Sequence, residues 1–149
     1  KARLERRAAR AFGLKDYGRA ILALEELLEV IGENANSLHV LSVCRQRQGA
    51  LDSAIAAAER GLAVDPDHLP CLKMLAEVHA ARDDLKIARG YATRALSLLD
   101  ARTRAPVTLL FRLRAAVDPR GSALVISPQD REWMRWARAL LDAGADNNH

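Results

Sequence analysis

The sequence repeats itself with a period of 34 residues, and this period constrains the fold more than any other feature of the chain. When the chain is aligned with itself at that spacing, similar residues coincide without a gap. The coinciding triplets are Leu4, Leu38 and Leu72; Ala20, Ala54 and Ala88; Leu28, Leu62 and Leu96; and the small residues Ala8, Ser42 and Ala76. A repeat of about 20–50 residues is typical of proteins built from stacked supersecondary units.

Each unit shows the pattern of two short helices joined by a tight turn. Leu38, Leu41 and Ser42 follow helical spacing in the first half of the middle unit, and Ala54 and Ala58 do so in its second half. The turns fall at Lys15-Asp16, Gly49-Ala50 and Asp83-Asp84. A single pair of helices cannot bury its apolar stripe alone, so successive pairs must stack. The chain is 50% hydrophobic but only 4% aromatic, which argues against a β-sandwich and favours an all-α fold.

The recurring residues form motifs that resemble a known family. The motifs are Leu38-x-x-Leu41-Ser42, Ala54-x-x-x-Ala58 and Val64-Asp65-Pro66 in the middle unit, and Leu72-x-x-Leu75-Ala76 and Ala88-x-x-x-Ala92 in the third. The chain thereby resembles the tetratricopeptide repeat (TPR) family, from whose pattern Arg7, Arg45 and His79 depart. The resemblance implies an α-α superhelix, a solenoid of antiparallel helix pairs, with repeats at 1–34, 35–68 and 69–102. Because the family is a scaffold used in many systems, the resemblance indicates the fold more than the function.

The match fades after residue 102, and we interpret residues 103–149 as a degenerate fourth helical pair that caps the stack. Its expected first helix has a stripe at Val107, Leu110, Leu113 and Val117, and Asp118-Pro119-Arg120-Gly121 ends it. Residues 122–126 are either a packed loop or extended chain. Ser127 as N-cap and Pro128 in the first turn predict the start of a last helix. We expect Trp133, Ala137, Leu140 and Leu141 on its buried face, Gly144 at its end and frayed residues from Asp146 to His149.

The resemblance also implies a binding surface, because the first helices of TPR units line a concave groove. The inward-facing positions of the family correspond here to Phe12, His39, Val43, Gln46, Arg47, Lys73, Glu77, Ala80 and Phe111. These residues would form an apolar strip with charged neighbours, which suits a peptide or helix. The alternative is that Phe12 and Phe111 only pack against neighbouring helices.

One type of ligand is not expected in this groove. Chaperone-binding members of the family hold a C-terminal carboxylate with Lys, Asn and Arg. The matching places here hold Glu5, Ala9, Val40, Pro70 and Met74. Since Glu5 would repel a carboxylate, we do not expect co-chaperone binding of that type.

The sequence contains no convincing catalytic or metal-binding motif. The nearest pair of metal ligands, His68-x-x-Cys71, is more simply a loop histidine and a half-buried cysteine. Cys44 and Cys71 differ by about two helical turns in their places within successive units, which leaves them too far apart for a disulfide. No nucleophile is set beside a base, and there is no glycine-rich phosphate loop. We therefore expect no enzyme activity, no metal and no cofactor.

Two surface features are open to interpretation. The basic residues Lys1, Arg3, Arg6, Arg7 and Arg10, and the group from Arg102 to Arg120, are either solvated faces or a surface for an acidic partner, with anionic lipid or nucleic acid as the remaining alternatives. Trp133 and Trp136 lie three residues apart on the last predicted helix, where both cannot easily be buried. One of them is then exposed and marks a contact with a missing segment or a partner.

The sequence favours a non-catalytic protein–protein interaction scaffold that binds a partner peptide or helix. Its alanine and arginine bias is typical of a GC-rich bacterial genome, so we expect assembly of a bacterial complex. The alternatives are a secretion-type chaperone that holds an unfolded segment, and a docking or targeting domain of a larger enzyme or membrane-anchored assembly factor.

Partners other than proteins are not expected from this composition. Nucleic acid is not expected at a formal net charge of +4. Membrane association would need a segment upstream of Lys1, because no apolar run approaches the roughly 20 residues that span a bilayer. The compartment, cytoplasmic or periplasmic, and the oligomeric state stay open.

Overall fold

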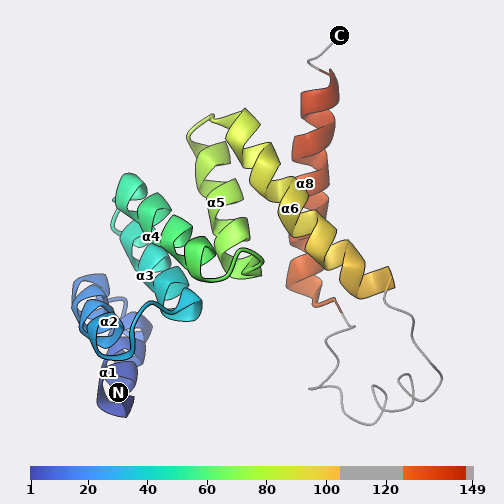
Figure 1. Ribbon diagram of the computed structural model, residues 1–149. Coiled ribbons are helices and arrows are strands. Elements are labelled where there is room, and N and C mark those ends of the chain that lie inside the picture. The colour runs from blue at the N-terminus through green and yellow to red at the C-terminus, as the bar shows by residue number, and fades with distance from the viewer. Residues whose placement is uncertain (105–125, 147–149) are drawn as a thin grey trace, which may run out of the picture. The chain divides into compact units, whose positions relative to one another are not determined.

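The computed structural model describes residues 1–104 and 126–146, which form seven helices (Figure 1). They are α1 (Ala2–Gly13), α2 (Tyr17–Ile31), α3 (Ala35–Arg47), α4 (Leu51–Val64), α5 (Leu69–Ala81), α6 (Leu85–Arg104) and α8 (Pro128–Asp146). The described residues contain no strand, so the predicted all-α class is confirmed. The chain divides into two compact units, Lys1–Tyr91 and Ala92–His149, with the division inside α6.

The 34-residue period is visible in the backbone of the turns within each helix pair. Lys15, Gly49 and Asp83 lie 34 residues apart, and all three have positive φ angles of 59°, 81° and 65°. The residue after each of them donates its backbone N–H to the carbonyl five residues earlier, at 2.9 Å in all three turns. The left-handed residue therefore reverses the chain at the same place in each unit, although only Gly49 has the residue type that favours this conformation.

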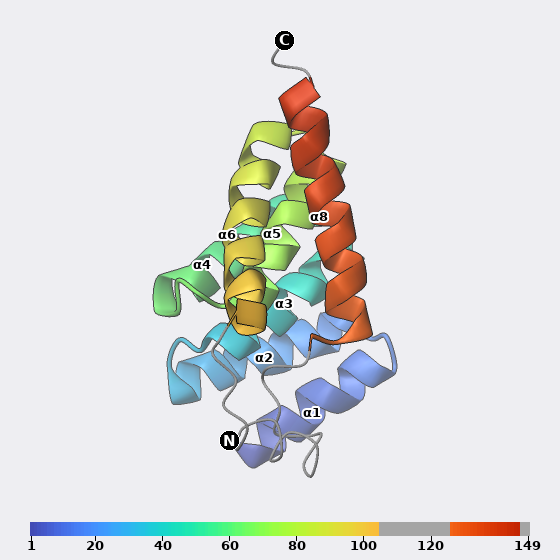
Figure 2. The ribbon, with the colours of Figure 1, turned by 90° about the vertical axis from the view of Figure 1, so that its right-hand side faces the viewer.

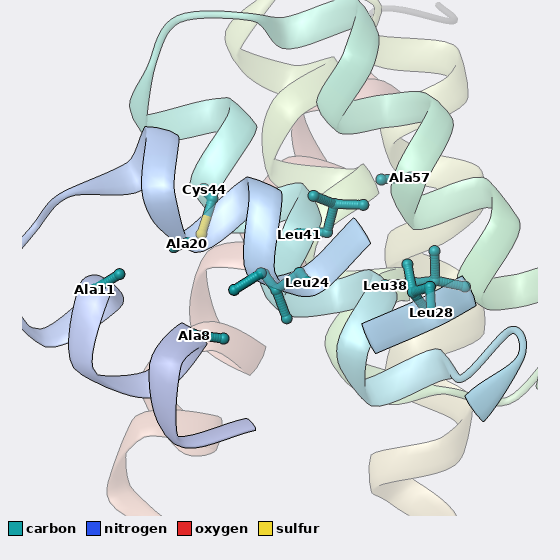
Figure 3. Packing of buried hydrophobic residues seen from close by; sticks show 10 residues of the cluster. Ala8, Ala11, Ala20, Leu24, Leu28, Leu38, Leu41, Cys44 and Ala57 are labelled. Carbon is teal, nitrogen blue, oxygen red and sulfur yellow. The ribbon is translucent and has the colours of Figure 1, made fainter. Parts of the chain in front are cut away.

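In the first unit the helix pairs α1·α2 and α3·α4 follow each other, with α2 against α3 and α4 against α5. The same order is visible in the view turned by 90° (Figure 2). The core between these layers consists of leucine and alanine. Figure 3 shows members of this buried cluster from α1, α2 and α3, among them Ala8, Leu24, Leu38 and Leu41. Stacked hairpins thus bury the stripes that each pair alone would expose.

Small side chains are buried at the repeated positions of the core. Ala20, Ala54 and Ala88 are fully buried, as the close approach of two helices requires. Ser42 is also fully buried, where the other units have alanine, and its hydroxyl donates to the carbonyl of Ala54 at 2.8 Å. This bond satisfies the only polar group that the repeat position introduces, and it ties α3 to α4.

The second unit contains the rest of α6 and the whole of α8. The predicted start of α8 is confirmed, because the Ser127 hydroxyl accepts the backbone N–H of Asp130 at 3.1 Å and Pro128 is the first helical residue. Trp133 and Ala137 are buried as predicted, while Leu140 and Leu141 are only half-buried. Arg138 of α8 forms an ion pair with Asp100 of α6 at 3.1 Å.

One prediction about the end of this helix is wrong. Gly144 does not end α8, which continues to Asp146. A glycine inside a helix costs only about 1 kcal/mol, so it does not by itself stop a helix. Gly144 is buried within this last turn of the helix. The predicted helix at 107–117, its stop at 118–121 and residues 122–125 lie outside the described residues. No helix among the described residues is long and apolar enough to cross a membrane.

Candidate functional site

A hollow of the first unit lies among α1, α2 and α3 and has a volume of about 390 Å³. We call it the α1–α3 groove. Its lining consists of Glu5, Ala8, Ala9, Phe12, Leu24, Leu27, Asn36, Ser37, His39, Val40 and Val43. Three residues of the predicted partner-binding set, Phe12, His39 and Val43, are brought together here. Most of the remaining lining is aliphatic, so the groove offers mainly an apolar surface.

Phe12 both packs and remains accessible. Its ring meets the ring of Tyr17 edge to face, with centroids 6.0 Å apart and planes at 72°. Its exposed fraction is nevertheless 39%, which is high for an aromatic side chain in a helix pair. Ala8 and Ala9 precede it on α1 and leave space that larger side chains would fill. Phe12 therefore packs against Tyr17 and also lines the groove, and that it contacts a partner stays a prediction.

The polar lining residues come from the beginning of α1 and of α3. They are Glu5 on α1 and Asn36, Ser37 and His39 on α3. Glu5 is exposed and has no ion-pair partner among residues 1–104 and 126–146. Burial lowers the pKa of His39, and the positive charges of Lys73 and of His68, when His68 is protonated, lower it further. His39 is therefore neutral at neutral pH, and Glu5 gives this part of the groove a negative charge.

A chain of polar contacts joins the groove to the third repeat. The His68 ring lies with Nε2 2.8 Å from Oδ1 of Asn36 and with Nδ1 3.1 Å from Sγ of Cys71. The His39 and His68 rings are 6.2 Å apart. The expectation of a half-buried cysteine is wrong, because Cys71 is fully buried and His68 is 8% exposed. His68 and Cys71 can both be buried because Nδ1 of His68 and Sγ of Cys71 contact each other.

The remaining predicted groove residues lie beyond this lining. Gln46 and Lys73 are half-buried, Arg47 and Glu77 are exposed and Ala80 is half-buried, on α3 and α5. Phe111 lies outside the described residues. That these residues extend the binding surface therefore stays a prediction.

Sequence reasoning missed the contribution of α2 to the groove. Leu24 and Leu27 line it, although the family pattern assigns inward positions only to the first helix of each unit. The repeat pattern contained a sign of this contribution of α2 that was not used. Leu24 coincides with Ala58 and Ala92, and Leu27 coincides with Gly61. A larger residue at one member of an otherwise small triplet indicates a place where the packing of that unit differs.

The arrangement suits binding rather than covalent chemistry. Cys44 and Cys71 are free thiols, and both are buried. Burial raises the pKa of both thiols, that of Cys71 to about 11, so neither is a ready nucleophile at neutral pH. The described residues contain no group of three or more His, Cys, Asp or Glu side chains placed to hold a metal ion. An apolar groove with a polar end can instead bury side chains of a ligand and orient it.

No protein-family model and no curated protein matches the sequence. Solved structures do match. PcrH in complex with the chaperone binding region of PopD aligns with a TM-score of 0.70 and 18% identity, over 99% of this chain and 92% of PcrH. The Sgt2 TPR domain from Aspergillus fumigatus aligns with a TM-score of 0.68 and 15% identity, over 99% and 83%.

A third match is the TPR2B domain of yeast Sti1 in its complex with pHsp70. It has a TM-score of 0.64 and 15% identity, over 93% of this chain and 95% of that one. At such low identity the three matches speak for the fold. The fold of this chain is TPR-like, as the repeat pattern predicted.

Proposed function

We propose that this chain is a non-catalytic protein–protein interaction module that binds a segment of a partner protein in the α1–α3 groove. The observation that supports this most directly is the groove itself, where Phe12 and Val43 leave apolar surface accessible. Exposed apolar surface of this kind is a common mark of a docking site. Two of the similar structures hold a partner region or peptide, PopD for PcrH and pHsp70 for Sti1 TPR2B.

The chemistry of the lining defines the ligand. A volume of about 390 Å³ is at the small end of ordinary ligand pockets, which span roughly 300–1,000 Å³. Such a space suits apolar side chains projecting from a longer segment better than the whole width of a helix. Glu5 adds a carboxylate at the polar end that has no ion-pair partner among the described residues. The segment we propose therefore presents apolar side chains to Phe12 and Val43 and a basic residue near Glu5.

Residues beyond the groove would set the orientation of the segment. We expect Arg47 at the end of α3 and Lys73 on α5 to contact acidic or polar groups of the ligand. Glu77 and Ala80 on α5, together with Gln46, would continue the surface toward the third repeat. This extension rests on the family's pattern of inward positions and on the TPR-like fold.

A second candidate is a secretion-type chaperone that holds an unfolded segment of a client. The alignment with PcrH supports it, because it covers nearly the whole of both chains and PcrH was solved with a chaperone binding region. Both candidates use the same groove. They differ in whether the bound segment stays unfolded, which amide exchange of the segment in the complex would reveal.

The test starts from a dodecapeptide selected against the whole chain from a displayed random library. Its affinity is measured by fluorescence anisotropy for the wild type, Val43→Glu and Val30→Glu. Val43→Glu should weaken binding at least about tenfold, because it places a carboxylate among apolar side chains. Val30 is 64% exposed on α2 and does not line the groove, so Val30→Glu should bind as the wild type does.

Other results would contradict the proposal. If Val43→Glu binds as tightly as Val30→Glu, or if selected peptides carry acidic rather than apolar and basic residues, the groove is not the binding site. Circular dichroism of both variants checks that the helices are intact. Arg47→Glu should have a smaller effect, since a charge at the rim mainly orients the ligand.

A further inference from the structure

The contacts of His68 determine where its proton lies. Oδ1 of Asn36 can only accept, so Nε2 of His68 must donate across the 2.8 Å contact. In a neutral imidazole Nδ1 is then an acceptor, and the Cys71 thiol must donate to it across 3.1 Å. The raised pKa of Cys71 agrees with this arrangement, because the thiol keeps its proton at neutral pH. Each group thus fixes the orientation of the next.

The space for the Cys71 thiol is left by a glycine in the neighbouring helix. Gly61 of α4 faces Cys71, and a Cβ atom at Gly61 would come within 2.6 Å of the sulfur. It would also lie 3.7 Å from the carbonyl of Ala35 and from Leu38. The sulfur is 4.0 Å from that same carbonyl, so His68 is its nearer acceptor. Because Gly61 has no side chain, the Cys71 sulfur can occupy the space that a Cβ atom at this position of α4 would fill.

The other end of this chain of contacts is Asn36, which lines the α1–α3 groove. Its oxygen is taken by His68, and its amide Nδ2 donates to no atom among the described residues. We propose that Nδ2 of Asn36 donates a hydrogen bond to a main-chain carbonyl of the bound segment, and that His68 and Cys71 are positioning residues for it. This inference rests on the function proposed above and adds how the groove recognises the main chain.

The surroundings favour a carbonyl over other acceptors. Glu5 lines the same groove and would repel a carboxylate or phosphate. Main-chain carbonyls occur at every residue of a segment, so one fixed neutral donor can bind them whatever the sequence is. The apolar lining then selects side chains, while Asn36 sets the position of the main chain. A donor whose amide group is held by His68 also loses little freedom on binding.

A small probe tests the contact without knowledge of the partner. N-acetyl-leucine N′-methylamide carries one apolar side chain between two peptide groups. It is titrated into the ¹⁵N-labelled chain with ¹³C-labelled valine methyl groups, and chemical shifts are followed by NMR. We expect the Val43 methyl signals and the Asn36 side-chain NH₂ signals to move together with one dissociation constant.

The two proposals fail in different ways in this titration. If the Val43 methyl signals move and the Asn36 NH₂ signals do not, the Asn36 contact is wrong and the groove is retained. If neither set moves up to the solubility limit of the probe, both the groove and the contact are contradicted.

Variants then test the donor itself. Asn36→Asp keeps an acceptor for His68 but replaces the donor by a carboxylate, so it should weaken probe binding about 3- to 10-fold, the range expected for one hydrogen bond. Gln129→Glu makes the same change of amide to acid on α8, outside the groove lining, and should leave the affinity unchanged. Equal affinities of Asn36→Asp and wild type would overturn the proposal.

The positioning role needs a measurement that general destabilisation would not reproduce. In Cys71→Ser the hydroxyl can still donate to His68, whereas Cys71→Ala removes the donor. The ring ¹⁵N shifts of His68 should report the Nε2–H tautomer in wild type and Cys71→Ser, and a change in Cys71→Ala. The probe should bind wild type and Cys71→Ser with similar affinity and Cys71→Ala more weakly. If both variants behave alike, whether unchanged or weakened, Cys71 does not position Asn36 through its proton.

Discussion

The junction between the first and second repeats uses the same repeat positions as the junction between the second and third, but the residues at those positions differ. At the first junction Leu27 of α2 and Ser37 of α3 line the groove. Thirty-four residues later the corresponding residues are Gly61 and Cys71, which touch inside the protein. At the first junction the larger residue is Leu27 on the earlier helix and the smaller one is Ser37. At the second junction the earlier helix has Gly61, the smallest residue, and the later helix has the larger Cys71. The space at one junction thus remains a groove, and at the other it is filled by a thiol.

The starts of α3 and α5 differ in the same way. Asn34 caps α3, with Oδ1 accepting the backbone N–H of Ser37 at 3.1 Å. His68 occupies the equivalent place before α5 and caps nothing with its side chain, which contacts Cys71 and Asn36 instead. The period fixes where side chains lie, while their identity decides whether a position serves the helix or the neighbouring repeat.

The largest expected effect tests what the two junctions share. Leu38 and Leu72 are equivalent and fully buried, so Leu38→Ala and Leu72→Ala should each lower the free energy of unfolding by about 2–5 kcal/mol. Urea unfolding followed by circular dichroism measures both. A cost well under 1 kcal/mol at either position would mean that this junction is not packed as described.

The next largest effect tests how the two junctions between repeats differ. Gly61→Ala should destabilise the protein by about 1–3 kcal/mol, because the new Cβ collides with the Cys71 sulfur. The cost should largely disappear in a Cys71→Ala background, which a double-mutant cycle measures. Gly90 of α6 has no atom within 4 Å of its would-be Cβ, so Gly90→Ala should stabilise by about 0.5–1 kcal/mol. A cost at Gly61 that persists without the thiol would contradict the proposed contact.

A smaller effect is expected at the cap. Asn34→Ala should cost about 0.5–2 kcal/mol, because the Ser37 N–H loses its acceptor. Asn34→Asp keeps an acceptor at the start of α3 and should be close to neutral. Thermal unfolding of both variants measures the difference, and equal melting temperatures would show that the side chain does not cap the helix.

The smallest effect concerns pH. His39 has a lowered pKa in the folded chain, so the unfolded chain binds the proton more readily. The free energy of unfolding should therefore be highest above the unfolded value of about 6.5 and should fall as the pH drops through the folded pKa. In His39→Gln this part of the decrease should be missing when unfolding is compared at neutral and acidic pH. An unchanged pH profile would contradict the assignment.

The sequence predicted those parts of the structure that repeat or that depend on neighbours along the chain. The helix pairs, the turns at Lys15, Gly49 and Asp83 and the Ser127 cap all follow from local spacing. The lining by Leu24 and the contacts of His68 with Asn36 could not be predicted in this way. They depend on which side chains of different repeats meet, and on room that Gly61 leaves in another helix. Gly144 shows the opposite error, in which a local helix breaker lies within a helix.

The central claim is that the partner segment lies in the α1–α3 groove, and two equally exposed aromatic residues allow a direct test. Phe12 in the groove is 39% exposed, and Trp136 on α8 is 38% exposed. Each is replaced in turn by the photoreactive p-benzoylphenylalanine, and the selected dodecapeptide is added and irradiated. The account predicts a cross-link from position 12 and none from position 136. Cross-linking from position 136 alone would contradict it.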